Sequence, residues 1–260
     1  MRQDDLIIRS GYVVTMDPEL GDFPDGDVLV TGGRIAVVGT GLDACGAREL
    51  DARGMIVAPG LVDTHWHLWN TLLRSMSGGM PGSGRPAGYF SVSLGLGQAF
   101  TDQDNYQGTL LACAEAVNSG ITTVHDWSHN VRGPAHAEAE LRALTGNADM
   151  FAIMKLTQGL INATAHQEFA CTARQALALG TIEGARSLGL DGVTGSLTPG
   201  KRADIILVAA GHPNLGVLTH PAGLLVTAAQ PGNVDTVLAD GRVLKRGGAL
   251  VTLDSERITA

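Results

Sequence analysis

The sequence predicts an α/β protein in which both chain ends build one small β-sandwich and an α/β domain is inserted between them. Short strand-like segments surround a hairpin signal near each end of the chain. In the middle, a helix signal leads directly into a strand signal. At 260 residues, the chain is long enough for one large domain or two smaller ones.

The two chain ends carry matching hairpin signals. Strand-like residues flank Gly32 and Gly33 at one end, and Asp240 and Gly241 at the other. The two sequences resemble each other, DVLVTGGRI at the first hairpin and DTVLADGRV at the second. Neither end has enough strands for a stable core of its own, so we expect the two ends to pack together.

The middle of the chain predicts a helix that is followed by a strand. Thr101, with Asp104 three residues later, is close to a capping box and marks a helix start. Gly120 suits the helix end, and the β-branched run 121–124 then predicts a strand. Further along, an amphipathic pattern predicts a second helix over 167–179. Helix followed by strand is the half-unit of an α/β fold.

The composition argues against several classes of protein. A net charge of −8 and the lack of a Lys/Arg cluster argue against a nucleic-acid-binding surface. No apolar stretch reaches membrane-spanning length, and the first residues lack the apolar region of a signal peptide. The three cysteines show no zinc-finger or redox spacing, which favours free thiols in a reducing compartment. We therefore expect a cytoplasmic protein without nucleic-acid or membrane partners.

His65 and His67 are the most informative residues of the chain. They follow an apolar run over 55–64 that is typical of a buried strand. Because residues two apart on a strand share a face, both imidazoles are expected to point the same way, beside Asp63. Two neutral imidazoles so placed can form half of a zinc or iron site. The same spacing also occurs where two histidines make only ordinary hydrogen bonds.

Three segments together resemble the amidohydrolase superfamily, in particular its deaminase and chlorohydrolase branch. They are residues 59–67 (PGLVDTHWH), 120–126 (GITTVHD) and 181–206, which begins TIEGAR and continues through GSLTPGKRADII. The segments occur in the family's order and together span most of the chain. The family inserts a (β/α)₈ metal-dependent hydrolase barrel into a β-sandwich that both chain ends form, so the resemblance implies this architecture here.

The resemblance also implies a function for the two histidines. His65 and His67 would lie at the C-terminal end of the first barrel strand, on the face that carries the active sites of this fold. They would bind one divalent metal ion, zinc or alternatively iron, which activates a water for hydrolysis. The implied activity is that of an aminohydrolase, which deaminates a small nitrogen heterocycle such as a purine, pyrimidine, pterin or triazine.

Further residues near the histidines are candidates for the same site. The resemblance favours Asn70 and Arg74, which follow at helical spacing, as substrate-binding residues. His129 lies beyond the second strand and is a third candidate for substrate binding, while Asp63 would orient one of the histidines. Simpler interpretations stay open: a solvated charge for Arg74, a surface histidine for His129 and a turn residue for Asp63.

The chain is too short for the complete barrel. The family's site also uses two more histidines, an aspartate and a glutamate from later strands, and none of them can be placed on this sequence. Only about 130 residues separate His67 from Gly195, whereas a complete barrel needs about 200 or more. Strands three to eight are therefore expected to be absent. The predicted domains are a sandwich over 1–57 plus 195–260 and a barrel over 58–194, truncated near 141–145.

Three interpretations of this gap stay open. The chain is an internally deleted, catalytically inactive relative that acts in binding or assembly, or it completes its site in a homo-oligomer, or the sequence omits segments of the whole protein. The intact motifs on both sides of the gap favour the third. An incomplete barrel leaves strand edges and apolar faces uncovered, which favours association into a homo-oligomer.

Overall fold

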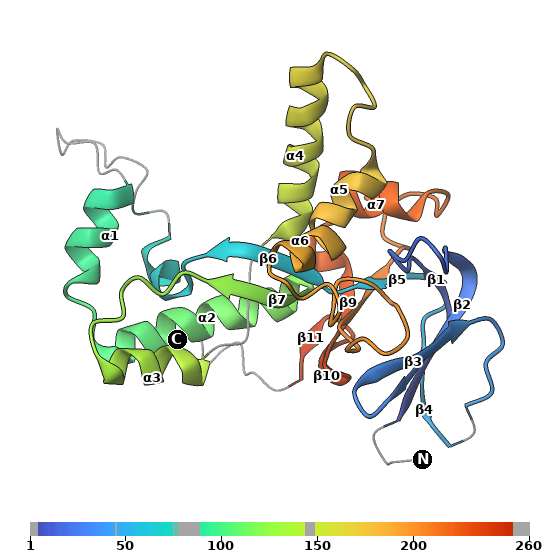
Figure 1. Ribbon diagram of the computed structural model, residues 1–260, viewed down its shortest axis with the longest axis horizontal. Coiled ribbons are helices and arrows are strands. Elements are labelled where there is room, and N and C mark those ends of the chain that lie inside the picture. Colours follow the sequence, from blue (N-terminus) through green and yellow to red (C-terminus); the bar gives the residue numbers. More distant parts are fainter. Residues whose placement is uncertain (1–4, 45, 75, 77–88, 144–148, 252–260) are drawn as a thin grey trace.

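The computed structural model describes residues 5–44, 46–74, 76, 89–143 and 149–251. In these ranges the chain forms a nine-stranded sheet and a separate two-stranded sheet, with helices packed around both (Figure 1). No helix in this part of the chain is long and apolar enough to cross a membrane.

The two chain ends share the nine-stranded sheet, as predicted. The sheet order is β11-β10-β9-β8-β5-β1-β2-β3, and β4 pairs with β1. The strands are β1 (Leu6–Val13), β2 (Phe23–Thr31), β3 (Arg34–Gly39), β4 (Arg48–Asp51), β5 (Met55–Pro59), β8 (Ile205–Ala209), β9 (Val234–Ala239), β10 (Arg242–Arg246) and β11 (Ala249–Leu250). Antiparallel pairing of β5 with β8 joins the two ends. The exact domain boundaries stay a prediction.

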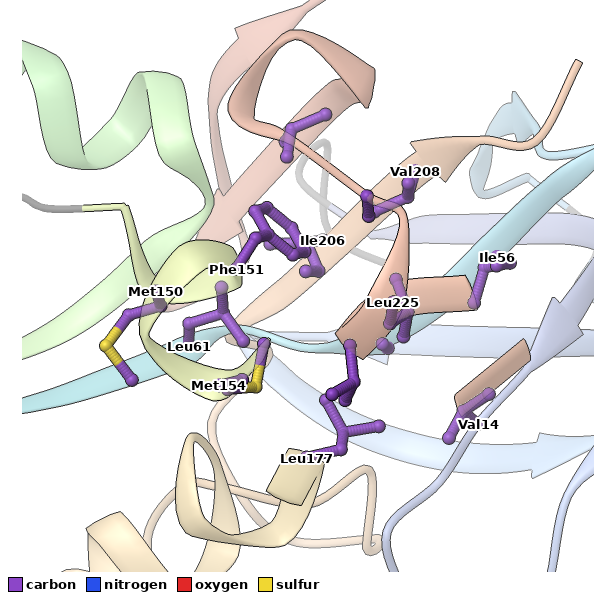
Figure 2. Close-up of a cluster of buried hydrophobic side chains, with 14 of the residues drawn as sticks. Val14, Ile56, Leu61, Met150, Phe151, Met154, Leu177, Ile206, Val208 and Leu225 are labelled. Atoms are coloured by element: carbon purple, nitrogen blue, oxygen red, sulfur yellow. The ribbon is translucent and has the colours of Figure 1, made fainter. Parts of the chain in front are cut away.

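The central strands of this sheet are buried on both faces. On β5, Val57 belongs to one apolar cluster, whereas its neighbours Ile56 and Ala58 belong to another. The cluster around Val57 combines side chains from both chain ends, so the sheet encloses an interior of its own, as a sandwich does. The other cluster packs against helices and includes Phe151 (Figure 2). Strands buried on both faces explain why this part of the sequence is apolar without alternation.

The two hairpin turns contact each other in the sheet. Gly33 and Gly241 have φ angles of 79° and 76°, in the left-handed region. A Cβ at Gly241 would lie 2.6 Å from the Cα of Gly33, so glycine is required at this contact. Ala203 joins both turns, because its N–H donates to the Gly33 carbonyl and its carbonyl accepts from the Gly241 N–H. The similar sequences of the two ends therefore meet in space.

The barrel is represented by two parallel strands. β6 (Leu61–Trp66) pairs with β7 (Ile121–Asp126), and among the described residues no third strand extends this sheet. Helix α2 (Asp102–Ser119) leads into β7, beginning at the capping box of Thr101 and Asp104 and ending at Gly120 with a φ of 85°. The 3-10 helix η1 (Leu68–Leu73) and helix α1 (Tyr89–Gly97) precede α2. Within the described residues, the prediction of an incomplete barrel is confirmed.

The remaining helices are α3 (Pro134–Ala143), α4 (Met150–Ala165), α5 (Ala173–Leu179), α6 (Ile182–Ser187), α7 (Pro221–Thr227) and the 3-10 helix η2 (Pro231–Asn233). Helices α4, α5 and α7 contribute to the apolar cluster on the sheet, α6 contacts β6, and α3 and η2 contact α2. The prediction of one helix over 167–179 is wrong at its start. Thr172 and Gln175 form a capping box, so α5 begins only after Thr172.

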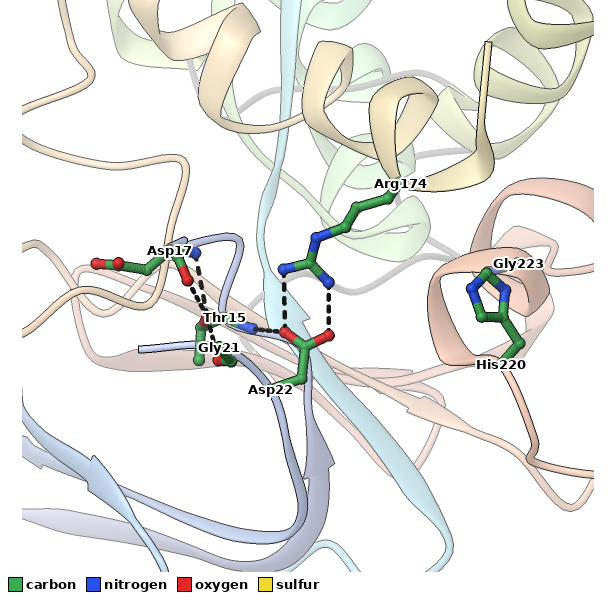
Figure 3. A network of polar contacts seen from close by, with 7 residues as sticks. All are labelled: Thr15, Asp17, Gly21, Asp22, Arg174, His220 and Gly223. Carbon is green, nitrogen blue, oxygen red and sulfur yellow. Dashed lines mark hydrogen bonds and ion pairs between the residues drawn. The ribbon is translucent and has the colours of Figure 1, made fainter. Parts of the chain in front are cut away.

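An ion pair between Arg174 and Asp22 connects helix α5 to the sandwich (Figure 3). The carboxylate accepts from both terminal nitrogens of Arg174, at 2.5 and 3.2 Å, and from the backbone N–H of Thr15 at 3.1 Å. The side-chain hydrogen bond to Asp22 raises the pKa of Arg174. The pair therefore joins elements that lie far apart in the sequence.

Replacing Arg174 with alanine is expected to lower the free energy of unfolding by about 1 kcal/mol, because the bidentate pair is only partly exposed. Urea denaturation measures the effect. Arg53→Ala is the matched control, since Arg53 pairs with Asp51 within one exposed turn. This control is expected to change stability by less than about 0.5 kcal/mol. Equal losses in the two variants would contradict the connecting role of Arg174.

Candidate metal site

The C-terminal ends of β6 and β7 lie side by side and carry the candidate site. The strands pair in parallel from Leu61 opposite Ile121 to Trp66 opposite Asp126. Beyond the last pair, the N–H of Trp127 donates to the carbonyl of Trp66 at 2.6 Å. In barrels and open α/β sheets, the carboxyl ends of parallel strands form the ligand-binding edge. The residues next to these strand ends therefore form the candidate site.

His65 and His67 lie close together at this edge. Their ring centroids are 5.3 Å apart, and the ring planes are 84° from parallel. With zinc–nitrogen bonds of about 2 Å, two imidazoles on one tetrahedral ion have centroids roughly 5 Å apart. The observed spacing therefore fits two ligands of a single ion.

The ring of His67 is oriented by the backbone of Trp127. Its Nδ1 lies 2.9 Å from the Trp127 carbonyl oxygen, which can only accept a hydrogen bond. The Nδ1 of His129 lies 3.1 Å from the same oxygen and 3.0 Å from the Nδ1 of His67. An Nδ1–H that donates to a carbonyl directs metal binding to Nε2.

Trp127 is a site residue that was not among the sequence-based candidates. Its ring stacks on His65 with centroids 4.5 Å apart and planes 20° apart, and 46% of the residue is exposed. The only signal in the sequence was its place directly after the strand that ends at Asp126. The contact itself depends on the pairing of β6 with β7.

Asp63 is buried below the histidines. Burial raises the pKa of its carboxyl group, while a hydrogen bond from the N–H of His65, at 3.0 Å, lowers it. This contact is to the backbone of His65. The carboxylate therefore holds the strand end in place, and a direct role in orienting an imidazole stays a prediction.

The three candidate substrate-binding residues, His129, Asn70 and Arg74, lie at different distances from His65 and His67. His129 contacts both His67 and Trp69, with ring centroids 4.5 and 5.2 Å apart. Asn70 lies in η1, where its N–H donates to the His67 carbonyl at 3.3 Å. Arg74 instead forms an ion pair with a glutamate of α2. The structure thus brings His129 to the histidine pair, and the substrate-binding roles of all three residues stay predictions.

A cavity of about 270 Å³ lies beside His65, along the edge of β6 that faces α4 and α5. One side is formed by β6 residues with polar groups, among them Asp63 and Thr64. The opposite side is apolar and includes Met150, Met154 and Leu179. A small molecule with both polar and apolar groups would match this distribution.

The ligand set for a metal ion is incomplete within the described ranges. No group of three or more His, Cys, Asp or Glu side chains there is arranged to hold a metal ion. All eight histidines of the chain belong to the described residues. A catalytic zinc takes three protein ligands and a water. The pair of His65 and His67 fits two of these positions, and the described residues do not supply the third.

The family model for amidohydrolases matches residues 56–146 and 136–244 of the chain. The 5'-deoxyadenosine deaminase of Methanosarcina mazei is 37% identical over 123 residues, which are 47% of this chain and 28% of that protein. The 5-methylthioadenosine/S-adenosylhomocysteine deaminase of Symbiobacterium thermophilum is 43% identical over 125 residues, 46% of this chain and 28% of that protein. The chain therefore matches less than a third of the length of these relatives.

Two solved structures show a similar fold. An adenosine deaminase from Xanthomonas campestris with bound zinc has a TM-score of 0.81 and 18% identity, covering 98% of this chain and 96% of that chain. An atrazine chlorohydrolase from Arthrobacter aurescens complexed with zinc has a TM-score of 0.75 and 16% identity, covering 98% of both chains. At these identities the likeness establishes the fold alone.

Proposed function

The chain belongs to the amidohydrolase family, and from this premise we propose that it serves the hydrolytic deamination of a nitrogen heterocycle. The observation that carries the proposal is the placement of His65 and His67 at one strand end, with a spacing that fits a single metal ion. The names of the curated relatives favour an adenosine-type substrate among the possible heterocycles. The proposed partner is therefore a small molecule.

The residues at the strand ends would bind and position a divalent metal ion, with zinc favoured because the similar structures hold zinc. Such an ion, when bound, lowers the pKa of a coordinated water toward about 7. His65 and His67 would supply two ligands, and the Trp127 carbonyl would hold the ring of His67 in place. Trp127 would keep the ring of His65 in position by stacking. The cavity beside His65 would accept the heterocycle.

A second candidate function is binding or assembly without catalysis. It is favoured because the described residues do not supply a third metal ligand. In this case the histidine pair would still bind a metal, but no water would be activated for attack. The two candidates therefore differ in activity and agree in metal binding.

Metal analysis and an ammonia assay separate the two candidates. The purified chain is expected to hold zinc that is lost in the double variant of His65→Ala and His67→Ala. Release of ammonia from adenosine, 5'-deoxyadenosine or another purine, pyrimidine, pterin or triazine supports deamination. Zinc binding without ammonia from any of these compounds supports the second candidate. A chain that binds no zinc would contradict both.

We propose a cytoplasmic location for the protein. Cys171 is a buried free thiol, which suits a reducing compartment. We also propose that the protein has no nucleic-acid or membrane partner.

A further inference from the structure

We infer that Asp126 is a positioning residue, which holds the ring of His67 in the orientation that a metal ion requires. The inference rests on the metal binding that the proposed function assigns to His65 and His67. It deepens that proposal by naming a residue that acts on a metal ligand through the backbone of both strand ends.

The carboxylate of Asp126 connects the ends of β6 and β7. Its Oδ1 accepts a hydrogen bond from the backbone N–H of Leu68 at 3.1 Å, and its Oδ2 accepts one from the hydroxyl of Ser128 at 2.5 Å. Leu68 directly follows His67, and Ser128 directly follows Trp127. One side chain therefore fixes the backbone on both sides of the 2.9 Å contact between the His67 ring and the Trp127 carbonyl oxygen.

The N–H of Leu68 depends on an acceptor from outside its own helix. Leu68 is the first residue of η1, and the first N–H groups of a helix have no partner within it. His67 precedes the helix as its N-cap, but its side chain makes no capping hydrogen bond. Leu68 is 0% exposed, so water is a poor substitute for the carboxylate. Without Asp126, the backbone at His67 must move or leave a buried donor unpaired.

The loop that follows Asp126 is also fixed at its far end. The side-chain amide of Asn130 donates to the Oδ1 of Asn105 in α2 at 3.2 Å, and both residues are buried. Between these two attachments lie Trp127 and His129, whose rings contact the histidine pair. The loop therefore meets the pair with its middle, while polar contacts at both ends determine its position.

This arrangement matches the way in which proteins orient metal ligands. A ligating imidazole is commonly oriented by a hydrogen bond from its second nitrogen to a carbonyl or carboxylate, which is held in turn by further hydrogen bonds. Here the Trp127 carbonyl contacts the His67 ring, and Asp126 holds the segments that carry both groups. Removal of such an outer group typically lowers metal affinity by about 10- to 100-fold.

Zinc titration of the full chain, in competition with a chromogenic chelator, tests the inference. Asp126→Ala is expected to bind zinc about 10- to 100-fold more weakly than the wild type. Asp126→Asn is expected to recover most of this loss. Asparagine keeps an oxygen for the Leu68 N–H, and its amide can donate to the Ser128 hydroxyl. Ser128→Ala removes only one of the two contacts and is expected to weaken binding by a smaller factor.

Asp17→Ala is the matched control. The carboxylate of Asp17 also accepts from a backbone N–H, that of Glu19 at 2.9 Å, and from a hydroxyl, that of Thr198 at 2.6 Å. These contacts lie in the sandwich, so the control loses the same kinds of hydrogen bond without touching the strand ends. Its zinc affinity is expected to equal that of the wild type. Circular dichroism verifies that each variant is folded.

The outcomes separate this inference from the proposed function. Unchanged zinc affinity in folded Asp126→Ala would overturn the positioning role and leave metal binding by the histidine pair intact. If Asp126→Ala does not fold, unchanged affinity in Ser128→Ala would overturn it instead. A loss in Asp126→Asn as large as in Asp126→Ala would also overturn it, because the carboxylate would then act on the ion directly. A wild-type chain that binds no zinc would overturn the inference and the proposed function together.

Discussion

Replacing Gly108 with alanine is expected to lower the free energy of unfolding by about 2–3 kcal/mol. Gly108 lies in α2, where a Cβ would be 2.2 Å from the carbonyl oxygen of Trp69 in η1. A backbone atom cannot turn aside as the end of a flexible side chain can, so α2 or η1 must move. The helix propensity of alanine recovers only about 0.5–1 kcal/mol. Steric overlap therefore dominates.

Urea denaturation of Gly108→Ala measures this loss, and Gly159→Ala provides the control. Gly159 lies in α4, and a Cβ there would meet no heavy atom within 4 Å among the described residues. The control is expected to gain about 0.5–1 kcal/mol from helix propensity alone. Since η1 begins directly after His67, Gly108→Ala is also expected to weaken zinc binding. A variant as stable as the control would contradict the close contact between α2 and η1.

Lys245→Met is expected to stabilise the protein by about 2 kcal/mol at pH 7. Lys245 is 1% exposed, and burial lowers its pKa from 10.5 to about 8. Keeping the ammonium charged inside the protein at pH 7 costs about 3 kcal/mol. The hydrogen bond from its Nζ to the Asn118 carbonyl, at 2.7 Å, contributes about 1 kcal/mol in the opposite direction. The cost of burial is therefore the larger effect.

The advantage of the Lys245→Met variant is expected to disappear as the pH rises. Below pH 8, Lys245 is charged in both the folded and the unfolded chain, and the full cost is present. Between pH 8 and 10.5, the folded protein releases the proton while the unfolded chain keeps it, so the wild type gains stability. Above this range only the lost hydrogen bond remains, and the variant is expected to be less stable by about 1 kcal/mol.

Urea denaturation at several pH values, with the wild type and both variants side by side, measures this crossover. Lys155→Met is the control, because Lys155 is exposed on α4. The difference between this control and the wild type is expected to stay within about 0.5 kcal/mol over the whole range. A difference between Lys245→Met and the wild type that does not change with pH would contradict burial of the charged group.

The main divisions of the fold could be predicted because they depend on local signals. The glycines of the two hairpins, the capping box at Thr101 and the left-handed Gly120 each act within a few residues. The start of α5 was predicted too early, because apolar spacing continues through residues that precede the cap at Thr172. The spacing of apolar residues does not show where the first helical hydrogen bond forms. A capping residue does, because its side chain accepts a hydrogen bond from the first turn of the helix.

The candidate site could be predicted only in part. His65 and His67 are two positions apart in the sequence, and the structure places their rings close together. Trp127 and His129 reach the pair across strand pairing, at separations of about sixty residues. No periodic pattern links residues so far apart, because their contact depends on which strands become neighbours. The cavity beside His65 likewise depends on the packing of α4 and α5 against β6.

Local patterns in the sequence were enough to predict that both chain ends pack together, and the family resemblance added that a part of a barrel lies between them with two histidines at the end of its first strand. Short-range rules of turns and caps are sufficient for the first conclusion, whereas the second depends on the resemblance of three longer segments to the family. The contact of Trp127 with His67, the burial of Lys245 against α2, and the absence of a three-ligand metal group among the described residues became visible only in the tertiary structure. The reason is physical: burial, ligand geometry and pKa depend on groups that folding brings together from distant parts of the chain.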